Sequence, residues 1–212
     1  SGSEAKSGGR RKDHYTRRAH ASGYHARSVY KLDELQKKFR LVRPGGRVLD
    51  LGAAPGSWSQ RLLEIVGTAG LVVACDLTPL EISGPENLIS LQGDFTDQKT
   101  ISEIDAHGPY DAVVSDAAPA TTGNRTVDTA RSEALVESAL AIAESVLRHG
   151  GSLAVKLFQG GAEQRLRGDM QPLFEKVAQA KPAASRKESF EVYLVGLGYQ
   201  GGNGHGDDSS TR

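Results

Sequence analysis

Four charged residues lie where charge is unusual. Lys156 and Glu191 each interrupt an otherwise apolar run, Asp116 follows another, and Lys31 lies in an amphipathic helical pattern. An unpaired charge in an apolar strand is costly, so we expect these side chains to meet. A lysine whose pKa is lowered by burial or by a second lysine can act as a base. The set therefore suits removal of a proton from a weak nucleophile, although a simple Lys156–Glu191 salt bridge would fit the same pattern.

A glycine-rich turn follows an apolar segment and has the sequence Asp50-Leu51-Gly52-Ala53-Ala54-Pro55-Gly56-Ser57-Trp58. Glycine lets a ligand approach the backbone, and the helix expected from Ser57 presents free N–H groups at its start. The spacing differs from G-x-G-x-x-G, and Asp50 would repel a pyrophosphate. An acid at this point suits an amine-bearing or cationic ligand, so the turn favours S-adenosylmethionine over a dinucleotide.

Three acidic residues, Asp50, Asp76 and Asp94, fall at the ends of successive strand-like segments. Ligands of doubly wound sheets bind at these ends. Asp76 is placed to accept from ribose hydroxyls and Asp94 from an adenine amine, although each could cap a following helix instead. Trp58 either forms a wall of the ligand site or packs into the core. With a methyl donor bound here, the lysines and carboxylates would suit methylation of an alcohol such as a ribose 2′-hydroxyl.

The elements that position these residues alternate along the chain. Strands are expected at 47–52, 71–77, 88–92, 111–115, 151–157 and 190–197, and helices at 28–40, 57–66, 97–106, 128–148 and 163–179. Such alternation indicates an α/β fold with a parallel, doubly wound sheet. The last strand could be antiparallel, in a hairpin with a segment near 183–186. We expect one domain at 13–200, with a basic extension at 13–46, between a disordered basic tail at 1–12 and a flexible Gly-rich tail at 201–212.

Basic residues are concentrated at the start of a chain whose formal net charge is zero. Residues 1–47 hold thirteen of the 26 Lys and Arg but four acidic side chains, a net charge of +9. This distribution favours a nucleic-acid partner. Tyr15, Tyr24 and Tyr30 lie among these cations and could stack on unpaired bases or pack the extension onto the domain.

Other classes of protein are disfavoured by the composition. No apolar run approaches the ~20 residues that span a bilayer, and no secretion signal is visible. The single cysteine, Cys75, excludes an intrachain disulfide and a cysteine-based metal site, and is expected to be buried. We expect a cytoplasmic monomer without a metal or a membrane partner.

Several ordered motifs resemble the FtsJ-type ribosomal RNA 2′-O-methyltransferases, over about residues 13 to 200. The motifs are Arg27-Ser28-Val29-Tyr30-Lys31-Leu32, the turn from Asp50 to Ser59, Gln92-Gly93-Asp94-Phe95, Ser115-Asp116-Ala117-Ala118-Pro119, Val155-Lys156-Leu157-Phe158-Gln159-Gly160 and Ser189-Phe190-Glu191-Val192-Tyr193-Leu194-Val195. The resemblance implies a Rossmann-like fold for S-adenosylmethionine-dependent methylation. Its seven-stranded, mostly parallel sheet has an antiparallel last strand and helices on both faces.

The resemblance also implies roles for individual residues. A catalytic tetrad falls on Lys31, Asp116, Lys156 and Glu191, with Lys156 as proton acceptor, and S-adenosyl-L-methionine positions fall on Gly56, Trp58, Asp76, Asp94 and Asp116. Asp50 and Gly52 join them from the turn. The implied substrate is a uridine in the A-loop of large-subunit (23S) rRNA, within the assembled 50S subunit. A tRNA methyltransferase, a ribosome-assembly binding protein and a small-molecule methyltransferase remain alternatives.

Overall fold

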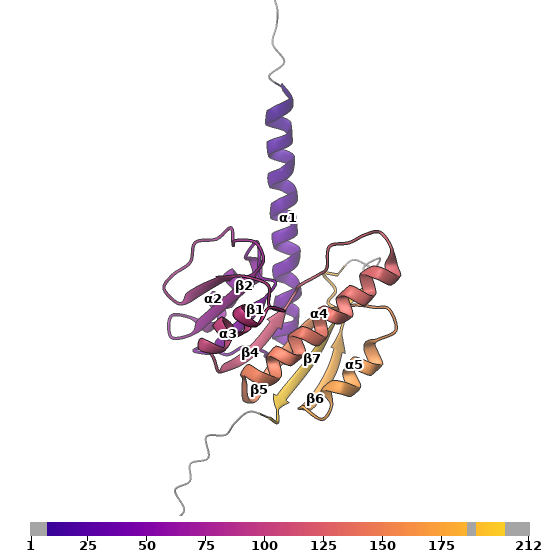
Figure 1. Cartoon of the computed structure of the whole chain (residues 1–212). Coiled ribbons are helices and arrows are strands. Elements are labelled where there is room, and N and C mark those ends of the chain that lie inside the picture. Colours follow the sequence, from indigo (N-terminus) through magenta and orange to yellow (C-terminus); the bar gives the residue numbers. More distant parts are fainter. Residues whose placement is uncertain (1–7, 186–189, 202–212) are drawn as a thin grey trace, which may run out of the picture.

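The protein is built on one seven-stranded sheet with the strand order β3-β2-β1-β4-β5-β7-β6 (Figure 1). A computed structural model describes residues 8–185 and 190–201, with side chains from residue 22 onward. The strands are β1 (Arg47–Leu51), β2 (Leu71–Asp76), β3 (Leu88–Gln92), β4 (Tyr110–Ser115), β5 (Leu147–Phe158), β6 (Phe174–Ala180) and β7 (Glu191–Tyr199). Strand β7 pairs antiparallel with both β5 and β6, whereas β1 to β5 pair in parallel. The expected fold class is confirmed.

In the described part of the chain, five helices cover the two faces of the sheet. They are α1 (Gly8–Phe39), α2 (Ser57–Val66), α3 (Gln98–Ala106), α4 (Arg125–Val146) and α5 (Glu163–Met170). Side chains of α1 and α2 share one core cluster with alternate strand residues such as Val48, and α3, α4 and α5 share the other with neighbours such as Leu49. This alternation follows from the two-residue period of a strand. Among the described residues, no helix is long and apolar enough to cross a membrane.

Helix α1 is longer than the sequence pattern predicts. The helix expected over 28–40 begins at Gly8, so residues 8–12, expected in a disordered tail, are helical. Leu32 and Leu35 of its last turns are buried against the sheet, whereas its first half extends away from the sheet (Figure 1). The apolar spacing in the sequence predicted only the second half of α1, which packs against the sheet. Residues 1–7 and 202–212 of the two expected tails lie outside the described residues.

The helix predicted over 163–179 was wrong in its second half. Helix α5 ends at Met170, and Phe174–Ala180 forms β6, which pairs with β7. Pro172 lacks an N–H and disfavours helix in the residue before it. The strand lies at the edge of the sheet, and its mixed burial weakens the alternation that would have identified it. The hairpin partner of β7 is thus β6, not the segment near 183–186.

Candidate active site

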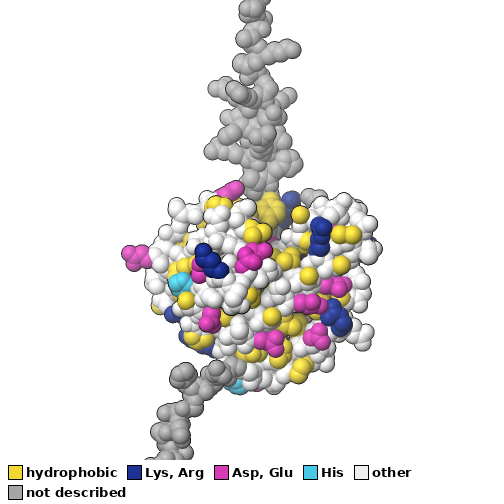
Figure 2. All heavy atoms as spheres, viewed as in Figure 1, with side chains coloured by type: hydrophobic (Ala, Val, Ile, Leu, Met, Phe, Trp, Pro, Cys, Tyr) yellow, Lys and Arg dark blue, Asp and Glu magenta, His cyan; other side chains and the backbone are white. Residues whose placement is uncertain are grey.

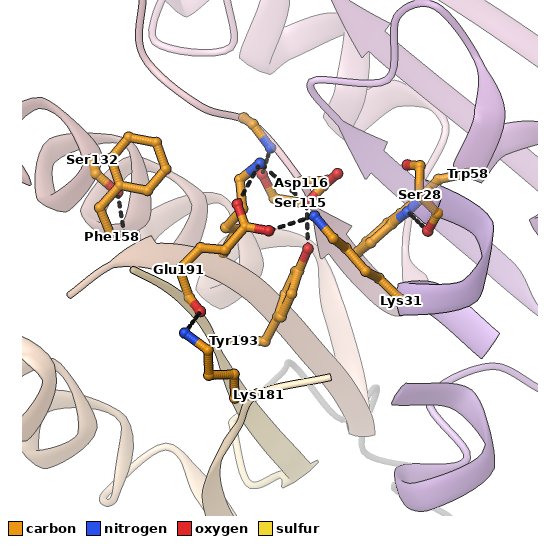
Figure 3. A network of polar contacts seen from close by, with 12 residues as sticks. Ser28, Lys31, Trp58, Ser115, Asp116, Ser132, Phe158, Lys181, Glu191 and Tyr193 are labelled. Carbon is orange, nitrogen blue, oxygen red and sulfur yellow. Dashed lines mark hydrogen bonds and ion pairs between the residues drawn. The ribbon is translucent and has the colours of Figure 1, made fainter. Parts of the chain in front are cut away.

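Four charged side chains converge at the end of the sheet (Figure 3). Lys31 comes from α1, Asp116 follows β4, Lys156 lies on β5 and Glu191 begins β7. The Lys156 ammonium lies 3.3 Å from Asp116 Oδ1 and 3.7 Å from Glu191 Oε2. Lys31 donates a hydrogen bond to the other oxygen of Glu191. The predicted convergence is therefore present, and so is the predicted Lys156–Glu191 salt bridge.

These four side chains are nearly enclosed. Their exposed fractions are 17% for Lys31, 13% for Asp116, 10% for Lys156 and 14% for Glu191. Charges attract more strongly where water is mostly excluded, so each ammonium is oriented by its carboxylate partners. The Glu191 carboxylate contacts both lysines through different oxygens. Two ammonium and two carboxylate groups leave the cluster neutral.

Tyr193 belongs to this cluster but was not predicted as a site residue. Its hydroxyl donates to Asp116 Oδ1 at 2.5 Å, and its ring stacks on Trp58 with centroids 5.9 Å apart. Burial, followed by the charge of Asp116, raises the pKa of Tyr193 well above its ordinary value. The phenol therefore stays protonated and donates to Asp116. The sequence feature that could have identified Tyr193 is its position two residues after Glu191, which places both side chains on the same face of β7.

A cavity of about 420 Å³ opens beside the cluster. Its lining includes most of the predicted cofactor positions, namely Asp50, Gly52, Trp58, Asp76, Asp94 and Asp116, and also Lys156. Gly56 does not line it. This glycine precedes α2 with φ +126°, and a Cβ there would lie 2.9 Å from Ile82. Gly56 therefore acts by shaping the turn.

The turn after β1 is tight because it packs against the segment after β4. Gly52 has φ +72°, and a Cβ built on it would lie only 2.6 Å from Ala117 Cβ. Its backbone N–H donates to the Cys75 carbonyl at 2.8 Å, which ties the turn to β2. Glycine is required here both for conformation and for space.

Asp50 lies at the floor of the cavity and is fully buried. Ser59 donates to its Oδ2 at 2.7 Å, whereas its Oδ1 has no partner among the described residues. Burial raises the pKa of Asp50 to about 7, against the opposing hydrogen bond from Ser59. A buried acceptor without a donor is costly, so this oxygen suits a ligand that brings an N–H.

The two acids at the ends of β2 and β3 are held by backbone donors. Asp76 accepts from Ala54 N at 2.9 Å and from Thr78 N at 3.0 Å. Asp94 accepts from the backbone and hydroxyl of Thr96 through Oδ1. These bonds lower the pKa of Asp94 and keep it ionised. Both carboxylates are thus fixed hydrogen-bond acceptors at the cavity wall. Such acceptors suit the hydroxyls and the amine of an adenosine.

Trp58 lies in the core and also lines the cavity, so both of its expected positions are compatible with the structure. It is 3% exposed, lines the cavity, and donates from Nε1 to the Ser28 carbonyl at 2.8 Å. Among the tyrosines of the basic extension, Tyr24 also lines the cavity and is 49% exposed, whereas Tyr30 is 62% exposed. The Tyr15 side chain lies outside the described residues.

The cavity thus offers acids, aromatic walls and an unpartnered buried oxygen. This donor set fits S-adenosylmethionine, which carries an amine, a sulfonium and ribose hydroxyls, better than a phosphate ligand. Within the described residues, no group of three or more His, Cys, Asp or Glu side chains could hold a metal ion.

Comparison with known proteins gives one consistent result. A family model described as FtsJ-like methyltransferase matches residues 24–199. Ribosomal RNA large subunit methyltransferase E of Treponema denticola is 50% identical over 190 residues, covering 89% of this chain and 96% of the relative. The protein of the same name from Syntrophobacter fumaroxidans is 50% identical over 187 residues, covering 88% and 95%. A crystal structure from Plasmodium falciparum, named as a ribosomal RNA methyltransferase, has a TM-score of 0.72 at 27% identity and covers 82% of this chain and 98% of that one.

Proposed function

This chain belongs to the FtsJ-like methyltransferase family, and on that premise we propose that it methylates a ribose 2′-hydroxyl of large-subunit rRNA. S-adenosylmethionine is the methyl donor. The observation that carries the proposal is the neutral cluster of Lys31, Asp116, Lys156 and Glu191 at the end of a cavity lined by fixed acids. The cluster supplies a base next to the place where a cofactor would lie.

The cavity residues hold the donor. Asp76 would accept from the ribose hydroxyls, Asp94 from the adenine amine, and the second oxygen of Asp50 from the amino group. Trp58 forms one wall. When bound, S-adenosylmethionine supplies an electrophilic methyl group on its sulfonium. The remaining chemistry is the handling of one proton by the chain's own side chains.

Lys156 first releases a proton to solvent, which leaves the cluster with one negative charge, and the neutral amine then accepts the proton of the 2′-hydroxyl as the oxygen attacks. With S-adenosylmethionine bound, the methyl group would pass to this oxygen, and the proton would remain on Lys156 as an ammonium. Asp116 and Glu191, 3.3 and 3.7 Å from that nitrogen, stabilise the charge. Tyr193 and Lys31 orient the two carboxylates. Positioning of the hydroxyl supplies much of the remaining rate.

We place the target at a uridine of the A-loop in the assembled 50S subunit. The names of the relatives from Treponema denticola and Syntrophobacter fumaroxidans support the rRNA substrate over tRNA. The basic extension supports a nucleic acid over a small molecule. A complete base-and-carboxylate cluster gives no advantage to a protein that only binds RNA in ribosome assembly.

The role of Lys156 can be tested with two variants. Lys156→Ala removes the base, and Lys156→Arg keeps a cation between the carboxylates but cannot give up its proton. We expect both to lower kcat by about 10²–10⁴-fold, with the Kd for S-adenosylmethionine within about twofold of wild type by calorimetry. Lys176→Ala, at an exposed position on β6, is the control. An active Lys156→Arg enzyme, or one that has lost cofactor binding, would refute the proposed role.

A further inference from the structure

An arginine lies over an aromatic ring at the edge of the active site. The guanidinium carbon of Arg125 lies 4.9 Å from the centroid of the Phe190 ring. The Phe190 ring in turn packs on Phe158, with centroids 4.9 Å apart. Arg125 begins α4, Phe158 ends β5 and Phe190 directly precedes β7. Three segments far apart in the sequence thus build one stack.

This stack adjoins the catalytic cluster. Phe190 directly precedes Glu191, and Phe158 is the register partner of Glu191 and lies two residues after Lys156. The Phe158 N–H donates to Ser132 Oγ of α4 at 2.9 Å, which fastens α4 to this end of β5. Phe158 and Ser132 are seen beside Glu191 in Figure 3. A group bound at Arg125 therefore lies next to the site of methyl transfer.

The charge of Arg125 is available for a ligand. The side chain is exposed, and no ion pair with a carboxylate involves it among the described residues. The neighbouring cluster cannot attract a phosphate, because its two lysines are matched by two carboxylates. Arg125 is thus an uncompensated cation beside a neutral site.

The stack also preorganises the guanidinium. A planar guanidinium on an aromatic face keeps its N–H donors at its rim, where they match two phosphate oxygens. The backbone under Arg125 is fixed by the Asn124 cap, whose side chain accepts from Val127 N at 3.1 Å. The positive end of the α4 dipole adds to the attraction for an anion.

We infer that Arg125, held on Phe190, binds a backbone phosphate of the RNA strand that carries the target nucleotide. This inference rests on the proposed function, since it names the contact that brings the RNA to the same site. Arg125 is a positioning residue: it fixes the strand, while the cluster performs the proton transfer.

The test measures binding of 50S subunits from cells lacking this activity as a function of salt, with turnover on the same subunits measured separately. Loss of one phosphate contact to single-stranded RNA lowers the slope of log K against log salt by about 0.7. We expect Arg125→Ala to show this change and to raise KM for the RNA about tenfold or more, with kcat and cofactor Kd within about twofold. Phe190→Leu keeps the charge, so it should weaken binding with an unchanged slope.

Arg131→Ala is the matched control, because Arg131 is an exposed arginine on the same helix and should change neither quantity. A wild-type salt slope and KM in Arg125→Ala would overturn the inference. A lower kcat at unchanged KM would also overturn it, since it would show that Arg125 supports the cluster instead of the RNA. Failure of the proposed function is distinguishable, because the wild-type enzyme would then bind the 50S subunits without methylating their RNA.

Discussion

At the scale of single residues, Asp50 differs from the other acids of the cavity. Asp76 and Asp94 have backbone donors, whereas Asp50 is fully buried and one of its oxygens has no partner among residues 8–185 and 190–201. In the unfolded chain its carboxyl ionises near its ordinary pKa of 3.8, and in the folded protein only near 7. The folded protein binds the extra proton between these values. Stability is therefore lost as the pH rises through this window, and the cost is fully present above it.

Asp50→Asn removes this titration. In cofactor-free protein, the free energy of unfolding of the variant relative to wild type should increase by about 2–3 kcal/mol between pH 5 and pH 8. Urea unfolding at several pH values measures this difference. If the free energies of unfolding of the two proteins changed with pH in parallel, the pKa of the Asp50 carboxyl would not be raised in the folded protein.

The site residues differ in how far the sequence could predict them. Lys156, Glu191 and Asp116 stand out because charge in or beside an apolar run requires a partner, whereas Lys31 in the N-terminal helix was assigned through the family resemblance. The structure brings all four together. The hydrogen bond from Tyr193 to Asp116 depends on the register of β7, which the chain does not reveal locally. The catalytic and cofactor roles themselves stay predictions until the variants are measured.

At the scale of elements, the turn between β1 and α2 shapes the cavity through Gly52. Gly45 provides a matched control, since its φ of +78° is similar but no atom lies within 4 Å of a built Cβ. We expect Gly45→Ala to cost about 1–2 kcal/mol of stability for its backbone conformation alone. Gly52→Ala should cost about 1–3 kcal/mol more, from the clash with Ala117, and should weaken cofactor binding.

Urea unfolding and cofactor titration of both variants separate the two contributions. The two variants could instead be equally destabilised and keep their cofactor affinity. That result would mean that the segment after β4 moves to accommodate the added methyl group, and that contact with Ala117 does not define the cavity.

The elements themselves were predictable where packing leaves a strong pattern. Strands β1, β2 and β4 each carry a run of apolar side chains on both faces, because both faces of the sheet are covered. Edge strand β6 was not predicted because its apolar and polar residues do not alternate between the two faces of the strand. The helical spacing of apolar residues in α5 also continues into it. The first half of α1 was missed because it makes no amphipathic stripe.

At the scale of the whole molecule, the charge is divided between the start of the chain and the remainder. The net charge of +9 over residues 1–47 is balanced by an acidic remainder. Acidic side chains predominate on the face that carries α4 and α5 (Figure 2), where Arg165 pairs with Glu133, Glu137 and Asp169. An RNA substrate would approach the end of the molecule with α1, the cluster and Arg125 at the start of α4, rather than the acidic side chains that surround Arg165. That arrangement stays a prediction for the basic extension, whose first side chains lie outside the described residues.

The most direct measurement is methyl transfer from labelled S-adenosylmethionine to 50S subunits, free rRNA and bulk tRNA from cells lacking this activity. Nuclease-resistant 2′-O-methylated dinucleotides are then mapped in each. The account predicts label in the 50S subunits at one uridine of the A-loop, and none with Lys156→Arg. Label in tRNA alone, label on a base instead of a ribose, or no label despite bound cofactor would contradict it.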